Sequence, residues 1–135
     1  MATGAPDGVL MIQVAVTVEN VPVVPAPAVE RAAGGKGRYS GTDTDYQTVV
    51  AWTVATGKVG DLKEILIISS NYAKTSLQIT VGAITWATAW LTQAAMPIIF
   101  EDLKLAAASV VTVSAKSTDG TSITVDAIIT AKEVG

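Results

Sequence analysis

The chain has 135 residues, 12 acidic and 9 basic side chains, a net charge of −3, and neither histidine nor cysteine. The length is that of one domain, and the missing residue types exclude disulfides, zinc–thiolate sites and Ser-His-Asp or Cys-His catalysis. Because nucleic-acid binding needs a basic surface, we expect no direct nucleic-acid partner, and we expect no enzyme activity and no cofactor.

Residues 1–46 are predicted to form an arm ahead of the main domain. Residues 1–8 are small and loose, and residues 9–18 alternate as a strand does. The apolar face of that strand holds Leu10, Ile12, Val14, Val16 and Val18. Three prolines follow, Pro22, Pro25 and Pro27, which favour extended backbone. No basic residue precedes the apolar run, so we expect no secretory signal and a protein that stays inside the cell that makes it.

Residues 30–46 are rich in glycine and charge, and we predict that they form an irregular segment. Gly34-Gly35-x-Gly37 superficially resembles a phosphate cradle, but it does not lie between a strand and a helix. A basic arm that contacts a neighbouring acidic surface is the better interpretation of Lys36 and Arg38. With Tyr39 and the three prolines, they are the predicted partner-binding residues.

The main domain, residues 47–135, is predicted to be all-β, with about seven strands in residues 48–134. The strands are expected near 48–54, 62–70, 76–81, 84–91, 96–100 and twice within 109–134. Turns are expected at 59–61, 71–74 and 82–83, and a loop at 101–108. The 62–70 strand is apolar on both faces, which predicts a central position in its sheet. Many short strands with glycine-rich turns indicate an antiparallel sandwich or barrel.

The last two strands carry the clearest pattern in the chain. Val111, Val113 and Ala115 alternate with polar residues, and Ile123 to Ala131 repeat the alternation. Asp119-Gly120 lies between them, and this dipeptide favours the tight turn of a β-hairpin. We therefore predict that the two strands pair with each other, with Asp126 and Lys132 on the outward face.

Three groups of residues suggest chemistry, and each has a simpler explanation. Asp43-x-Asp45 has the spacing of calcium ligands but lacks the rest of a calcium loop. Glu101 and Asp102 are adjacent, so on a strand they point to opposite faces and do not form a carboxylate pair. Trp52, Trp86 and Trp90, with Tyr39, Tyr46 and Tyr72, could form a sugar-binding platform, although tryptophan in a small sandwich is more often core.

Hydrophobic residues make up 50% of the chain and charged residues 16%, below the roughly 25% of an ordinary soluble domain. The longest apolar runs are strand-sized, well short of the roughly 20 residues of a membrane-spanning helix. We therefore expect no membrane insertion. The apolar excess instead predicts burial against other subunits.

Residues 48–134 resemble the jelly-roll β-sandwich proteins of tailed phages and related virions. The resemblance is carried by Trp52-Thr53-Val54 with Thr56-Gly57-Lys58, by the strand ending Ser69-Ser70-Asn71, and by residues 111–134 with their Lys116–Ser122 connection. It implies a jelly-roll-like sandwich with an N-terminal arm and a capsid decoration or cement protein. Such a protein would be a homo-oligomer, with a trimer favoured, bound to the major capsid protein. It would be made in the host cytoplasm and lie on the virion surface. The alternative is a carbohydrate- or receptor-binding module.

Overall fold

The computed structural model describes residues 28–135, which fold into eight strands and one short 3₁₀ helix. The predicted tail, the predicted strand at 9–18 and the three prolines lie outside the described residues. The elements are β1 Glu30–Gly41, β2 Gln47–Thr53, β3 Val59–Ser69, η1 Tyr72–Lys74, β4 Thr75–Val81, β5 Ile84–Trp90, β6 Met96–Leu105, β7 Val110–Ser117 and β8 Ile123–Val134. No helix in residues 28–135 is long and apolar enough to cross a membrane.

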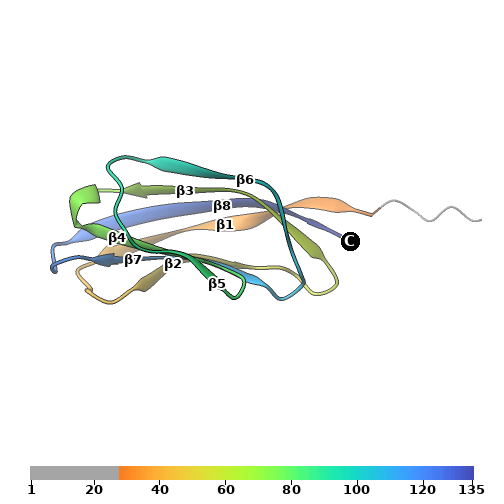
Figure 1. The fold of residues 1–135 in the computed structure, drawn as a ribbon, viewed down its shortest axis with the longest axis horizontal. Helices are drawn as coiled ribbons and strands as arrows, with labels where there is room; N and C mark the ends of the chain where they lie inside the picture. The colour runs from red at the N-terminus through yellow and green to blue at the C-terminus, as the bar shows by residue number, and fades with distance from the viewer. Residues whose placement is uncertain (1–27) are drawn as a thin grey trace, which may run out of the picture.

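The strands form two antiparallel four-stranded sheets that pack face to face (Figure 1). Sheet A has the order β1-β8-β3-β6, and sheet B has the order β2-β7-β4-β5. Successive strands therefore alternate between the sheets, except for β4 and β5, which is the strand order of a jelly roll. The predicted all-β sandwich is confirmed, as are its seven strands after residue 46 and the central position of β3.

The core lies between the two sheets and is formed by the inward faces of alternating strands. In β4, Leu77, Ile79 and Val81 are buried, as their alternation predicts. β7 and β8 contribute to the core from opposite sheets, and each is flanked by a strand on both edges. Their buried residues are Val111, Val113, Ala115, Ile123, Val125, Ala127, Ile129 and Ala131.

The predicted hairpin between β7 and β8 is wrong, since the two strands lie in different sheets. Residues 118–122 form an arch that carries the chain from one layer to the other. Ser117 Oγ donates to the Thr121 carbonyl at 2.7 Å, and Asp119 accepts from the Thr121 amide at 3.1 Å. Lys74 and Thr121 lower the pKa of Asp119 to about 2 through hydrogen bonds to its carboxylate. Asp-Gly is used here for an arch, and the hairpin turn is Gly82-Ala83, between β4 and β5.

The prediction of an irregular segment over residues 30–46 is wrong for residues 30–41. These residues form β1, which pairs with β8 from Glu30–Val134 to Gly41–Ile123. Its glycines serve close packing rather than loop flexibility. A Cβ at Gly37 would lie 2.0 Å from the Val49 carbonyl oxygen of β2, and Gly34 has a φ of 106°. Glycine therefore lets β1 lie against β2 and close one edge of the sandwich.

Two smaller boundaries also differ from the predictions. Residues 59–61 form the start of β3 rather than a turn, and β6 continues through residues 101–105, where we predicted a loop. A β-bulge in β3 between Leu62 and Glu64 faces an irregular part of β6. Asp102 has a φ of 58° there, a conformation that aspartate tolerates better than most residues. Strand signals are weak in such distorted pairs because the alternation of side chains is broken.

Replacing Gly37 with alanine should lower the free energy of unfolding by about 1–3 kcal/mol, because the new methyl group would push β1 away from β2. Gly35→Ala is the matched control, since a Cβ there would make an ordinary 3.7 Å contact with the Val50 side chain. Denaturant unfolding of both variants measures the difference. Equal stability of the two variants would contradict the close packing of β1 on β2.

Candidate interaction surface

The outer face of sheet A brings together exposed apolar side chains and charged groups, among them Lys36 and Arg38. The registers of β1, β8, β3 and β6 align outward-facing residues in rows across this sheet. One row holds Lys36, Ile128, Leu66 and Pro97, and the next holds Arg38, Asp126 and Ile68. At the opposite end, Lys132, Asp61 and Lys104 share a row. We refer to this whole surface as the outer face.

The middle of the outer face is an apolar band made by Leu66, Ile68, Pro97, Ile99 and Ile128. Ile99 is 66% exposed and Ile68 is 42% exposed, and Ile128 is also exposed. Large apolar side chains that cluster on a surface with polar residues at both ends are typical of binding sites. Pro97 lies on an edge strand, where proline is tolerated, because β6 is the last strand of sheet A.

Lys36 and Arg38 border the apolar band at one end. The Arg38 guanidinium donates to both carboxylate oxygens of Asp126, at 2.7 and 3.0 Å. This pairing raises the pKa of Arg38 and lowers that of Asp126, so both remain charged near neutral pH. Together with Ile68 and Ile128 they line a shallow hollow of about 460 Å³. The hollow therefore places two cations, the paired Arg38 and the nearby Lys36, beside the apolar side chains of Ile68 and Ile128.

The predicted partner-binding residues are thus only partly brought together. Lys36 and Arg38 share the outer face. Tyr39 points to the opposite side of β1, where its ring packs on the core and its hydroxyl bonds to the Asp43 carboxylate at 3.0 Å. Pro22, Pro25 and Pro27 lie outside the described residues.

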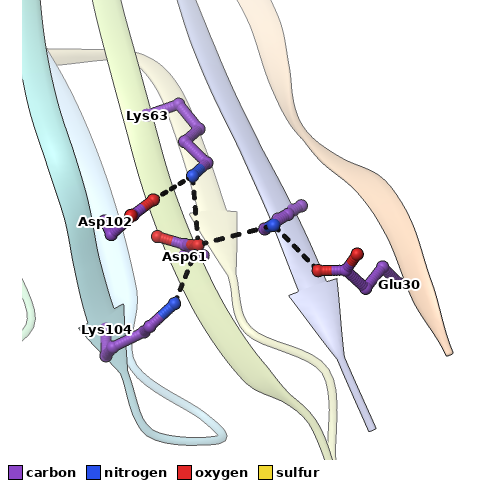
Figure 2. Close-up of polar contacts among 6 residues, drawn as sticks. Glu30, Asp61, Lys63, Asp102 and Lys104 are labelled. Atoms are coloured by element: carbon purple, nitrogen blue, oxygen red, sulfur yellow. Dashed lines mark hydrogen bonds and ion pairs between the residues drawn. The ribbon is translucent and has the colours of Figure 1, made fainter. Parts of the chain in front are cut away.

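Asp61 is the centre of an ion-pair cluster at the other end of the outer face (Figure 2). Its Oδ2 lies 2.9 Å from Lys104 Nζ, 3.2 Å from Lys63 Nζ and 3.9 Å from Lys132 Nζ. The lysines leave only 1% of Asp61 exposed. Asp102 pairs with Lys63, and Glu30 pairs with Lys132 at 2.8 Å. Three carboxylates therefore balance three ammonium groups, drawn from β1, β3, β6 and β8.

The charges of the Asp61 cluster are fixed rather than reactive. Burial raises the pKa of Asp61, but hydrogen bonds from Lys104 and Lys63 outweigh it, and the pKa lies below its ordinary value. Hydrogen bonds to Asp102 and Asp61 raise the pKa of Lys63. A lysine held protonated is a poor nucleophile or base, and an ionised aspartate is not a general acid. The cluster therefore forms a polar border at one end of the outer face. Among the described residues, Asp61 Oδ1 has no hydrogen-bond partner.

Glu133 is a second buried acid, and it points inward between the sheets. Its carboxylate accepts from Arg31 at 2.7 Å, from the Ala55 amide at 2.9 Å and from the Trp52 indole at 3.3 Å. The Ala55 and Arg31 hydrogen bonds lower the pKa of Glu133, against the effect of burial. Because its partners come from both sheets, Glu133 joins the two layers. The simpler interpretation of the tryptophans as core residues is confirmed for Trp52, whereas Trp90 is only partly buried and Trp86 is exposed.

A second apolar surface lies at the edge of the sandwich, between β5 and β6. It is a groove of about 510 Å³. Its lining is Val81, Ile84, Trp86, Ile98, Ile99, Phe100, Leu103, Lys104 and Leu105. Trp86 is 51% exposed, and its ring centroid lies 5.4 Å from that of Phe100. We call this surface the edge groove, and it lies at the edge opposite to the one that β1 and β2 close.

The remaining candidates do not form sites within residues 28–135. No group of three or more acidic side chains is placed to hold a metal ion there. Asp43 bonds to Tyr39, and Asp102 bonds to Lys63. Glu101 and Asp102 therefore do not form a carboxylate pair. A scan of known protein families finds no match to the sequence, and a search of curated proteins finds no similar chain.

Sequence reasoning missed the Asp61 cluster because its members are far apart in the chain. Asp61 was assigned to a turn, and Lys104 to a loop. Only the outward position of Lys132 was expected. A signal did exist in the alternation of β8, which places Lys132 on the outward face. Its partner could not be found without the register that sets Lys132 opposite Asp61.

Asp61→Asn should lower the free energy of unfolding by about 1–3 kcal/mol, because three lysines would lose their shared carboxylate. Asp102→Asn is the matched control. Its side chain is mostly exposed and asparagine tolerates its positive φ, so a change within about 0.5 kcal/mol is expected. Denaturant unfolding of the two variants is the measurement. A larger loss from Asp102→Asn would contradict the central role of Asp61.

The protein should lose stability as the pH falls from about 4 to about 2. The pKa values of Asp61, Asp126 and Glu133 are lowered in the folded state, and that of Asp119 is lowered to about 2 from 3.8. The unfolded chain therefore binds protons first, and acid favours it. Unfolding free energies measured across this range should fall less steeply for Asp61→Asn than for the wild type. Parallel pH profiles would show that Asp61 does not contribute.

Proposed function

We propose that this protein is a structural component of a virion, a capsid decoration or cement protein that forms a homo-oligomer on the shell surface. The observation that carries the proposal is a jelly-roll sandwich with two exposed apolar surfaces among the described residues, the outer face and the edge groove, which meet at Ile99 and Lys104 of β6. A jelly roll by itself hosts many functions, so the weight rests on these surfaces.

The outer face is the surface proposed to sit on the major capsid protein. Its apolar band is bordered by the Arg38–Asp126 pair at one end and by the Asp61 cluster at the other. An apolar centre with a polar rim is the usual composition of a protein–protein interface. Lys36, whose side chain lines this hollow and makes no ion pair within residues 28–135, would pair with an acidic group of the shell. The rigid sheet beneath fixes these side chains before binding, which reduces the entropy lost on association.

Oligomerisation explains the second surface. Hydrophobic residues make up 50% of the chain. If sheet A binds the shell, the edge groove is still exposed. Closed cyclic symmetry covers such a groove once per copy, and we favour a trimer. The N-terminal residues would then reach neighbouring copies and strengthen the shell. Under this proposal the protein is made in the host cytoplasm and functions on the virion.

The paired state of the charged groups supports a structural role over an enzymatic one. Asp61, Asp126 and Glu133 are each held by one or more cationic partners. Catalysis by carboxylates needs two of them to face one substrate with different pKa values. The described residues contain no such pair at either surface.

A carbohydrate- or receptor-binding module is the second candidate, and the exposed ring of Trp86 is the observation in its favour. Sugar rings stack on tryptophan but also need hydrogen-bond partners beside it. Lys104 is the one charged residue in the groove lining, and the other side chains there are apolar. The edge groove therefore suits an apolar segment better than a sugar.

Particles of the virus that encodes the chain should bind the purified protein, and Ile68→Lys should weaken binding at least tenfold by placing a charge in the apolar band. Thr53→Lys, an exposed change on the other sheet, is the matched control and should bind like the wild type. Co-sedimentation with particles measures the binding, and ultracentrifugation measures the mass. A protein that stays monomeric and never binds a shell would overturn the proposal. Glycan binding that is lost in Trp86→Ala would favour the second candidate.

A further inference from the structure

We infer that the edge groove is filled by residues 9–18 of a neighbouring copy, which lie along it as an added strand. The inference rests on the proposed function, because it assumes that copies of the chain meet on an assembled particle. It identifies the segment that fills the edge groove, which the proposed function does not specify.

The first argument is the unprotected edge of β5. Edge strands usually carry charges or proline, or are covered, since their free backbone groups attract other strands. β1 and β6 carry charged residues, and β2 is covered by β1 at Gly37. β5 has no charged residue and no proline, and within residues 28–135 it pairs with β4 alone. Its pairing with β4 is irregular at two points, but its outer edge remains available.

The second argument is chemical complementarity. Residues 9–18 contain no charged side chain and alternate with a period of two, so a strand formed by them has one fully apolar face. The groove is apolar along β5 and β6, with Ile84, Trp86 and Leu103 among its lining residues. Strand addition of this kind gains affinity from main-chain hydrogen bonds and specificity from alternate side chains.

The length of the connecting residues indicates which copy supplies the segment. Glu30, where β1 begins, lies in the same end row of sheet A as Val134 and Val59, and β6 ends beside it at Leu105. From β1 to β6 the sheet spans three strand spacings, about 14 Å. The connecting residues 19–29 include three prolines, and an extended proline-rich spacer of this length covers about 34 Å. A stiff spacer much longer than the span favours a neighbour's groove over the chain's own.

The absence of cysteine from the chain allows a direct test by disulfide trapping. Full-length Val14→Cys is mixed with full-length Leu103→Cys under mild oxidation, and Val14→Cys is mixed with Thr53→Cys as the control. The inference predicts a Val14–Leu103 cross-linked pair in at least fivefold excess over the control pair. Mass spectrometry of the digested product identifies the linked peptides. Equal yields of the two pairs would overturn the inference.

The same cysteines separate a neighbour's groove from the chain's own. A double variant with both Val14→Cys and Leu103→Cys should form linked oligomers, and the yield should fall on dilution. A disulfide that closes within one chain at every concentration would overturn the inference. If particles still bind the protein while cross-linking fails, the inference alone is wrong. If the protein neither oligomerises nor binds particles, the proposed function is wrong as well.

A second measurement avoids oxidation. Val14→Asp places a charge on the apolar face of the segment, whereas Gln13→Asp places the same charge on its polar face. The first should lower the mass of the oligomer in solution, and the second should leave it unchanged, with both variants retaining the circular dichroism of the wild type. A loss of mass in both variants, or in neither, would contradict the assignment.

Discussion

The close approach of β1 to β2 is the constraint on which the rest of the molecule depends. It is possible because Gly37 leaves room for the Val49 carbonyl oxygen of β2. This approach closes one edge of the jelly roll, where β1 is also paired with β8. The opposite edge, between β5 and β6, has no such closure, and the edge groove lies there. The sandwich therefore has one closed edge, where β1 packs on β2, and one open edge, between β5 and β6, which is available for contacts.

The two buried acids, Glu133 and Asp61, lie on opposite faces of sheet A. Glu133 lies inside, where it joins Arg31 and Trp52 across the two layers. Asp61 lies outside, where three lysines cover it and hold its pKa below the ordinary value. Both acids are paired with cationic groups of their own chain, whereas the side chains of the apolar band are apolar and at least partly exposed on the outer face. Removing a partner from a buried charge is costly, so these clusters fix the registers of β1, β3 and β8.

Much of the fold could be predicted from sequence because its signals are local. The alternation in β4 and in β7 sets which residues are buried, and the apolar pattern of β3 indicated its central position. Pairing could not be predicted, because alternation is the same whether β7 and β8 share a sheet or face each other. Asp119-Gly120 suits a hairpin turn and an inter-sheet arch equally well. The glycines of β1 look like a loop until the contact with Val49 is known. Of the candidate site, Lys36 and Arg38 were found from their charge, whereas Asp61 depends on register between distant strands.

Amide hydrogen exchange in the full-length protein, followed from low to high concentration, tests most directly the account of one closed and one open edge. The β1 amides that pair with β8 should exchange slowly at every concentration, because β1 is a packed strand of the sandwich. β5 amides should exchange quickly in dilute solution and slow down as copies associate. Fast exchange throughout β1, or exchange of β5 that does not change with concentration, would contradict the account.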